Sequence, residues 1–300
     1  MSREQEIYQY SRMEIDSNMT KEQFRERLAQ GKMILDGATG SNLQERGLPA
    51  GVCPEEWILE NPDVLKELQI EYYAAGSDAV YAPTFSGNRI KLEEYGLQDN
   101  LVEMNHGLVA ISKQAVAEVK ERGLVDADKP LYVCGDLTMT GKQVQPMGPL
   151  SFEELVDIYK EQTEALVDAG VDFLAVETMM SLQESRAALI AAKETCPDIP
   201  VMVTMTFESD GRSLFGTDAA TAAIVLSSLG ADAVDMRAVF QVLFRIGIAQ
   251  RKHRIFMYHL LKLFREVAPH PPGRGIRIGE LGMRRLQFLQ LFHHLIKLKV

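Results

Sequence analysis

The stretch SFEELVDIYKEQTEALVDAGVDFLAVETMMSLQESRAALIAAKETCPDIPVMVTMTF (residues 151–207) passes twice from a helix pattern to a strand pattern. The Ser-x-x-Glu spacing of a capping box occurs in it twice and predicts helices that begin after Ser151 and after Ser181. Each predicted helix is followed by a short apolar run that predicts a strand, over 171–178 and over 200–207. Because most residues of these runs are apolar, both faces of the strands are expected to be buried, as in a parallel sheet covered by helices.

The same order of apolar run, polar loop and amphipathic helix extends to both sides. The predicted strands are 33–36, 79–84, 131–136, 171–178, 200–207 and 231–234. The predicted helices are 21–30, 61–75, 151–169, 181–196 and 218–229, with a further polar and apolar stretch over 98–122. Polar residues follow the strands, as at the sites of both (β/α)8 barrels and open doubly wound sheets. The wide strand spacing and the lack of a G-x-G-x-x-G turn favour an α/β fold of the (β/α)8 TIM barrel type, incomplete because only about six units are recognisable.

Five polar residues near these strand ends are candidate site residues: Asp36, Thr84, Asn88, Glu177 and Thr204. Asp36 either faces a pocket or hydrogen-bonds its own turn. Glu177 follows largely apolar residues, so it needs a partner, either in a site or in a structural ion pair. The three neutral residues offer hydrogen bonds, and each taken alone is better explained by a structural role.

The cysteines and the histidine of the first 235 residues form no metal motif. Cys53, Cys134 and Cys196 are widely spaced and odd in number, which argues against a disulfide framework and against a C-x-x-C metal site. Cys134 is expected to be a small core residue of a strand, and His106 a surface or packing residue of a helix. No P-loop, G-x-S-x-G or H-E-x-x-H motif occurs in the sequence.

The charge of the chain reverses near residue 235. The 300 residues carry 32 Lys and Arg against 42 Asp and Glu, but residues 236–300 hold 13 basic and only 2 acidic residues. This tail also has no Ser, Thr, Asn or Asp, which is abnormal for a globular segment. We therefore expect two parts, a barrel domain over 1–235 and an aberrant basic tail over 236–300.

Composition also excludes several classes of protein. A hydrophobic content of 46% rules out disorder of the whole chain. No long uncharged apolar run and no signal-peptide layout occur in the sequence, so we expect a cytoplasmic protein without a membrane partner. The acidity of the first 235 residues disfavours nucleic acid as a partner.

Four stretches of the first part resemble the homocysteine S-methyltransferase family, and most closely the homocysteine-binding domain of the cobalamin-dependent methionine synthases. They begin with ILDGATGSNLQERGL and end with VMVTMTFESDGRSLFGTDAATAAIVLSSLGADAV, and they cover about residues 20–235 in family order: 34–48, 53–92, 148–189 and 201–234. The resemblance implies a (β/α)8 barrel that transfers a methyl group to the sulfur of homocysteine, giving methionine. It also implies zinc held by three Cys thiolates, which lowers the pKa of the bound thiol.

The resemblance further implies roles for the candidate residues and a methyl donor. Asp36 and Glu177 resemble the acidic residues that hold the ammonium group of homocysteine, with Thr84, Asn88 and Thr204 lining the same mouth. The donor is methylcobalamin on a separate cobalamin-binding domain, or S-methylmethionine or a betaine in stand-alone relatives.

The tail departs from the family pattern where the zinc ligands are expected. An Asn-Cys pair should end the sixth strand and a Gly-Gly-Cys-Cys turn should follow the eighth, but ADAV is followed by DMRAVFQVLFRIG and no Cys occurs after Cys196. The tail is then a frameshifted segment, a basic amphipathic segment that binds a membrane surface or an acidic partner, or a diverged barrel closure. We expect no metal ligands and an inactive chain; the alternative is a non-catalytic amino-acid-binding or interaction protein.

Overall fold

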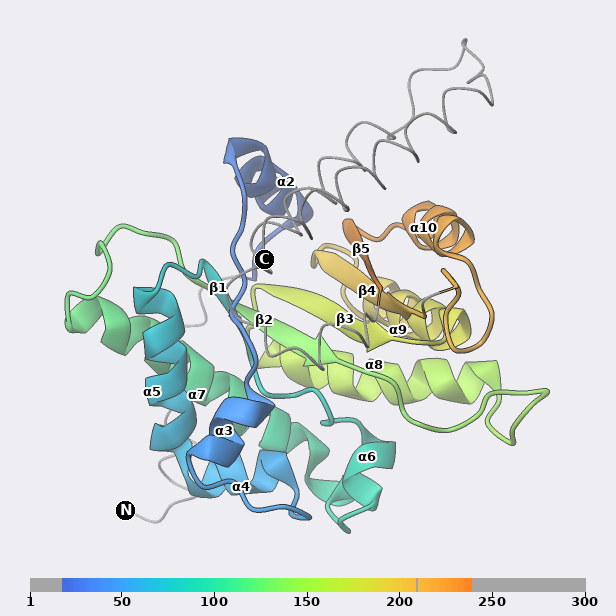
Figure 1. Ribbon diagram of the computed structural model, residues 1–300, viewed down its shortest axis with the longest axis horizontal. Helices are drawn as coiled ribbons and strands as arrows, with labels where there is room; N and C mark the ends of the chain where they lie inside the picture. The colour runs from blue at the N-terminus through green and yellow to red at the C-terminus, as the bar shows by residue number, and fades with distance from the viewer. Residues whose placement is uncertain (1–17, 209, 239–300) are drawn as a thin grey trace, which may run out of the picture. The chain divides into compact units, whose positions relative to one another are not determined.

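Five strands form one parallel sheet in the computed structural model, which describes residues 18–208 and 210–238, with side chains as far as residue 235 (Figure 1). The strands lie side by side in chain order: β1 (Ala79–Tyr81), β2 (Tyr132–Leu137), β3 (Phe173–Met179), β4 (Val201–Phe207) and β5 (Ala233–Ala238). Sequential order without a reversal is the topology of a β/α barrel, whereas a doubly wound sheet changes direction at a switch point. The predicted barrel-type α/β architecture is therefore confirmed for this part of the chain.

Helices precede and connect the strands. They are α2 (Lys21–Gln30), α3 (Gly40–Glu45), α4 (Pro54–Glu60), α5 (Pro62–Ala74), α6 (Arg89–Glu93), the short 3-10 helix η1 (Gln98–Asn100), α7 (Leu101–Glu121), α8 (Phe152–Asp168), α9 (Leu182–Thr195) and α10 (Ala219–Ser228). The predicted caps are present: the Ser151 hydroxyl accepts from the Glu154 N–H, and the Ser181 hydroxyl from the Glu184 N–H. None of the described helices is long and apolar enough to cross a membrane.

The outer face of the sheet packs against α8 and α9 (Figure 1). Alternate strand residues such as Val133, Leu174 and Val203 form the main core with Leu155 and Ala188 of these helices. All five side chains are 2% exposed or less, so their burial stabilises the sheet at roughly 25 cal/mol per Å² of apolar surface removed from water.

The inner face of the sheet is buried as well. Cys134, Phe173 and Ala175 point to this side and pack with Met19 and Phe24. The rings of Phe24, on α2, and Phe173 lie 5.4 Å apart between centroids. Burial on both faces agrees with the apolar strand runs, and Cys134 is the core residue that the sequence predicts.

Two predicted strands are shorter than expected. The segment 33–36 makes a single bridge, between Leu35 and Ala79, before the chain turns into α3. β1 ends at Tyr81 instead of residue 84, because Pro83 has no N–H to donate and the Thr84 N–H turns back to the Ala82 carbonyl, at 2.7 Å. The predicted sixth strand is β5; of the predicted tail, only residues 236–238 lie within the described part.

Candidate functional site

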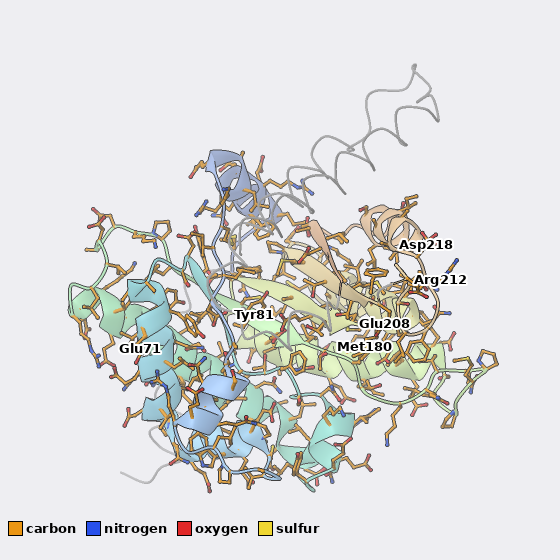
Figure 2. The ribbon with its side chains drawn as sticks, viewed as in Figure 1. Glu71, Tyr81, Met180, Glu208, Arg212 and Asp218 are labelled. Carbon is orange, nitrogen blue, oxygen red and sulfur yellow. The ribbon has the colours of Figure 1, made fainter. Side chains whose placement is uncertain are left out.

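Acidic and hydroxyl side chains gather at the carboxyl ends of the strands, on the inner face of the sheet. Since side chains alternate along a strand, Asp136 follows Cys134 to this face and Glu177 follows Ala175. Thr204 follows the inner-face residue Met202 in the same way. We call Asp36, Asp136, Glu177 and Thr204 the strand-end mouth. Figure 2 shows Tyr81, Met180 and Glu208, which mark this end of β1, β3 and β4.

The carboxylate of Asp36 has one satisfied and one unsatisfied oxygen. Its Oδ2 accepts from the Tyr81 N–H at 3.3 Å, while its buried Oδ1 has no hydrogen-bond partner within residues 18–208 and 210–238. Burial raises the pKa of Asp36 well above its usual value, and the negative charge of Glu177 raises it further. A cationic donor placed here would satisfy the oxygen and relieve this repulsion.

The backbone around Glu177 is irregular and is held from both sides. The pairing of β3 with β4 shifts register between Val176 and Met179, a bulge of the kind that redirects a side chain next to a site. Thr178 takes a φ of 55°, which is strained for a β-branched residue. The Thr204 hydroxyl accepts from the Thr178 N–H at 2.8 Å, and the Thr138 hydroxyl donates to the Glu177 carbonyl at 3.0 Å.

Thr84 joins the loop after β1 to the mouth. It is fully buried, and its hydroxyl donates to the Asp136 carbonyl at 2.9 Å and accepts from the Asp136 N–H at 3.0 Å. Asn88 caps α6 through its Oδ1, which accepts from the Lys91 N–H. Its buried Nδ2 has no hydrogen-bond partner in the described part of the chain.

Four of the five predicted residues take two roles, and the fifth, Asn88, caps α6. Asp36 and Glu177 bring charge to the same place, whereas the hydroxyls of Thr84 and Thr204 bond to main-chain groups of neighbouring strand ends. The sequence identifies Asp136 as a strand-end residue. Because it lies two residues after Cys134, its side chain points to the same face of the sheet, and this spacing was the signal for its place in the mouth. Thr138 had no such signal, because its contact depends on the bulge in β3.

The cysteines do not provide a set of metal ligands. Cys53 precedes α4, Cys134 lies in β2 and Cys196 follows α9, and all three are free thiols. Burial raises the pKa of the Cys53 thiol to about 11 and that of Cys134 well above its usual value, so neither is a thiolate at neutral pH. Among the described residues no three His, Cys, Asp or Glu side chains are grouped as metal ligands. His106 is a partly buried residue of α7 whose Nε2 lies 3.3 Å from the Asp168 carboxylate, which agrees with the predicted surface or packing role.

Comparison with known proteins places this arrangement in a family. The family model described as homocysteine S-methyltransferase matches residues 33–244. Methionine synthase of Mycobacterium leprae is 29% identical over 223 residues, and that of Mycobacterium tuberculosis 29% over 221 residues; each match covers 70% of this chain. The chain spans 18% of the length of either relative.

The solved structure of the homocysteine methyltransferase MmuM from Escherichia coli has a similar fold. Its metallated form superposes with a TM-score of 0.61 at 21% identity, over 71% of this chain and 76% of that one. Its apo form gives a TM-score of 0.55 over 70% and 73% of the two chains, again at 21% identity.

Proposed function

Because the chain belongs to the homocysteine S-methyltransferase family, whose model matches more than half of its residues, we propose that the strand-end mouth binds the amino acid homocysteine. At the level of the family, the reaction is transfer of a methyl group to homocysteine, which gives methionine. The relatives support this assignment, and the carboxyl-end position of the mouth is where β/α barrels carry their sites.

The observation that carries the proposal is the unsatisfied oxygen of Asp36 beside the charge of Glu177. The ammonium group of an amino acid carries three N–H donors and a positive charge, as does the side chain of lysine. Such a group would satisfy Oδ1 of Asp36 and offset the repulsion between the two carboxylates. We assign Asp36 and Glu177 to the ammonium group, and place Thr84, Asn88 and Thr204 around them.

We propose that this chain binds homocysteine without methylating it. In the family, zinc makes the thiol of homocysteine nucleophilic by lowering its pKa. The described residues do not fit that ion, since the cysteines are separated, and the sequence has no Cys after Cys196. No transfer step is therefore assigned to its side chains.

The family resemblance and the greater length of the relatives support a proposal for the methyl donor and the partner. The methionine synthases are much longer than this chain, which is compatible with a donor carried by another domain. We propose methylcobalamin on a separate cobalamin-binding domain or protein as the donor that the family reaction would use. A cytoplasmic location and the lack of nucleic-acid and membrane partners remain part of the same proposal.

The division at residue 235 into barrel and aberrant tail is also a proposal. β5 continues to Ala238 and the family match to residue 244, so a change of reading frame would fall at or just after this strand. Sequencing the gene around codons 230–245 tests it. An alternative reading frame that continues into Asn-Cys and Gly-Gly-Cys-Cys would establish a frameshift. An alternative frame interrupted by stop codons would exclude a frameshift and support a real tail.

Calorimetric titration tests the binding proposal. The 300-residue chain is titrated with L-homocysteine and with 4-mercaptobutanoate, which lacks the amino group. We expect heat of binding with homocysteine and none with the desamino compound. Equal binding of the two would contradict the role of the carboxylates, and methyl transfer from methylcobalamin, S-methylmethionine or a betaine would contradict inactivity. Binding without transfer would also agree with the alternative, a protein that only binds amino acids.

A further inference from the structure

Three buried amide side chains hold the loop that follows β1. Gln69, Asn105 and Gln162 lie on α5, α7 and α8, and none of their side chains is exposed. Each donates a hydrogen bond to a backbone carbonyl of the segment 81–87. Burying an amide costs free energy unless it is hydrogen-bonded, so three of them aimed at one short segment fix that segment in place.

Gln162 makes the shortest of these contacts. Its Nε2 donates to the Thr84 carbonyl at 2.7 Å. The same carbonyl also accepts from the Gly87 N–H at 2.9 Å, which closes the turn. Loss of the Gln162 amide would therefore leave the carbonyl with one partner and would free the turn from α8.

Asn105 and Gln69 hold the two ends of the segment. Nδ2 of Asn105 donates to the Gly87 carbonyl at 3.0 Å, and Nε2 of Gln69 to the Tyr81 carbonyl at 3.0 Å. A fourth buried group, the Glu55 carboxylate, accepts from the Ser86 N–H at 3.1 Å. Polar groups from four helices thus meet the backbone between Tyr81 and Gly87.

The held loop reaches the mouth directly. Thr84 bonds through its hydroxyl to both main-chain groups of Asp136, and Asp36 accepts from the N–H of Tyr81. A shift of this loop would move two members of the mouth at once. Sites bind tightly when the residues around them keep the groups that touch the ligand in place.

We infer that Gln69, Asn105 and Gln162 are positioning residues for amino-acid binding, acting through the loop 81–87. They do not touch the ligand themselves. The inference rests on the proposed function, because it names how that site is held. Its separate consequence is that the amides keep the loop ordered whether or not a ligand is bound.

The test compares Gln162→Met and Gln69→Met with the wild-type chain. Methionine keeps the length of glutamine but has no N–H to donate. We expect the Kd for L-homocysteine to rise about tenfold, the equivalent of one lost hydrogen bond. Hydrogen–deuterium exchange should become faster in peptides that cover 82–88, including the Gly87 N–H, and stay unchanged in β3 and β4.

Thr163→Val is the matched control. Thr163 is the neighbour of Gln162 on α8, is fully buried, and its hydroxyl has no hydrogen-bond partner among the described residues. The Thr163→Val variant should leave both the Kd for L-homocysteine and the hydrogen–deuterium exchange of the loop unchanged. Exchange that rises evenly across the sheet in the Met variants, or that stays at the wild-type level, would overturn the inference. If the wild-type chain binds no homocysteine, the proposed function fails, and the loop exchange still decides whether the amides position the loop.

Discussion

The Asp36 and Glu177 carboxylates act on each other across the inner face of the sheet: burial raises the pKa of Asp36, and the charge of Glu177 raises it further. The two residues are far apart in the sequence, and one follows a single β-bridge while the other lies at a bulge. A pair of like charges with an unsatisfied oxygen is unfavourable in the free protein. Such a cost is typical of binding sites, where a ligand of opposite charge offsets it.

Asp36→Asn should stabilise the chain in a pH-dependent way. The raised pKa means that the folded chain keeps a proton that the unfolded chain loses as the pH rises above about 3.8. Between the pKa of Asp36 in the unfolded chain and its raised pKa in the folded chain, the carboxyl therefore destabilises the fold more as the pH rises. Below the pKa of the unfolded chain it has no such effect. The free energy of unfolding of Asp36→Asn minus that of wild type should grow over this window in urea titrations. A difference that stays flat with pH would contradict the account.

Thr178 and Thr204 should respond to substitution in opposite directions. Thr178→Gly relieves the positive φ of residue 178 and is expected to add up to about 1 kcal/mol to the free energy of unfolding, because glycine adopts this conformation without strain. Thr204→Val removes the acceptor of the Thr178 N–H and should cost about 1–3 kcal/mol. Chemical denaturation measures both. Loss of stability in Thr178→Gly would mean that the strain assigned to the bulge is absent.

Gly87→Ala should destabilise the chain and weaken homocysteine binding. A Cβ at this position would lie 2.6 Å from Oδ1 of Asn105 and 3.0 Å from both Nε2 of Gln162 and the Thr84 carbonyl. Overpacking of this kind costs about 1–3 kcal/mol. Gly40→Ala is the control, since nothing lies within 4 Å of its added methyl group. Melting temperatures and titrations that are equal for both variants would contradict the close packing of the loop.

Zinc content tests the proposed inactivity. The purified chain, incubated with zinc and then dialysed, is expected to retain far less than one ion per chain, because its described cysteines are separated and protonated. Elemental analysis gives the value directly. One tightly bound zinc per chain would require ligands outside the described residues and would reopen the question of catalysis.

The sequence predicted the larger helices and the sheet because their signals are local. Capping boxes and apolar runs depend on neighbours along the chain, and the hydroxyls of Ser151 and Ser181 bond as expected. The short helices α3, α4 and α6 were not predicted, since five to seven residues carry too little periodicity. Pro62 begins α5, but the Asn61 side chain before it donates to the Trp57 carbonyl, at 2.9 Å, and does not cap the helix.

The positioning amides were missed although a signal existed. A buried apolar residue lies four positions before and four positions after each amide, which places the amide on the core face of its helix. These flanking residues are Leu65 and Tyr73 for Gln69, Leu101 and Val109 for Asn105, and Ile158 and Leu166 for Gln162. A polar residue within an apolar helical stripe needs a buried partner. The identity of that partner, a carbonyl of the loop after β1, follows only from the fold.

Binding of L-homocysteine to Glu177→Gln, measured by calorimetry beside the wild-type chain, tests the central claim most directly. The variant keeps the size of the side chain and removes its charge, so we expect the wild-type chain to bind and the variant to bind at least about tenfold more weakly. Glu153→Gln, the same change at an exposed position of α8, should bind as the wild type does. Equal affinity of the wild-type chain and Glu177→Gln would contradict the assignment of the strand-end mouth to an amino-acid ammonium group.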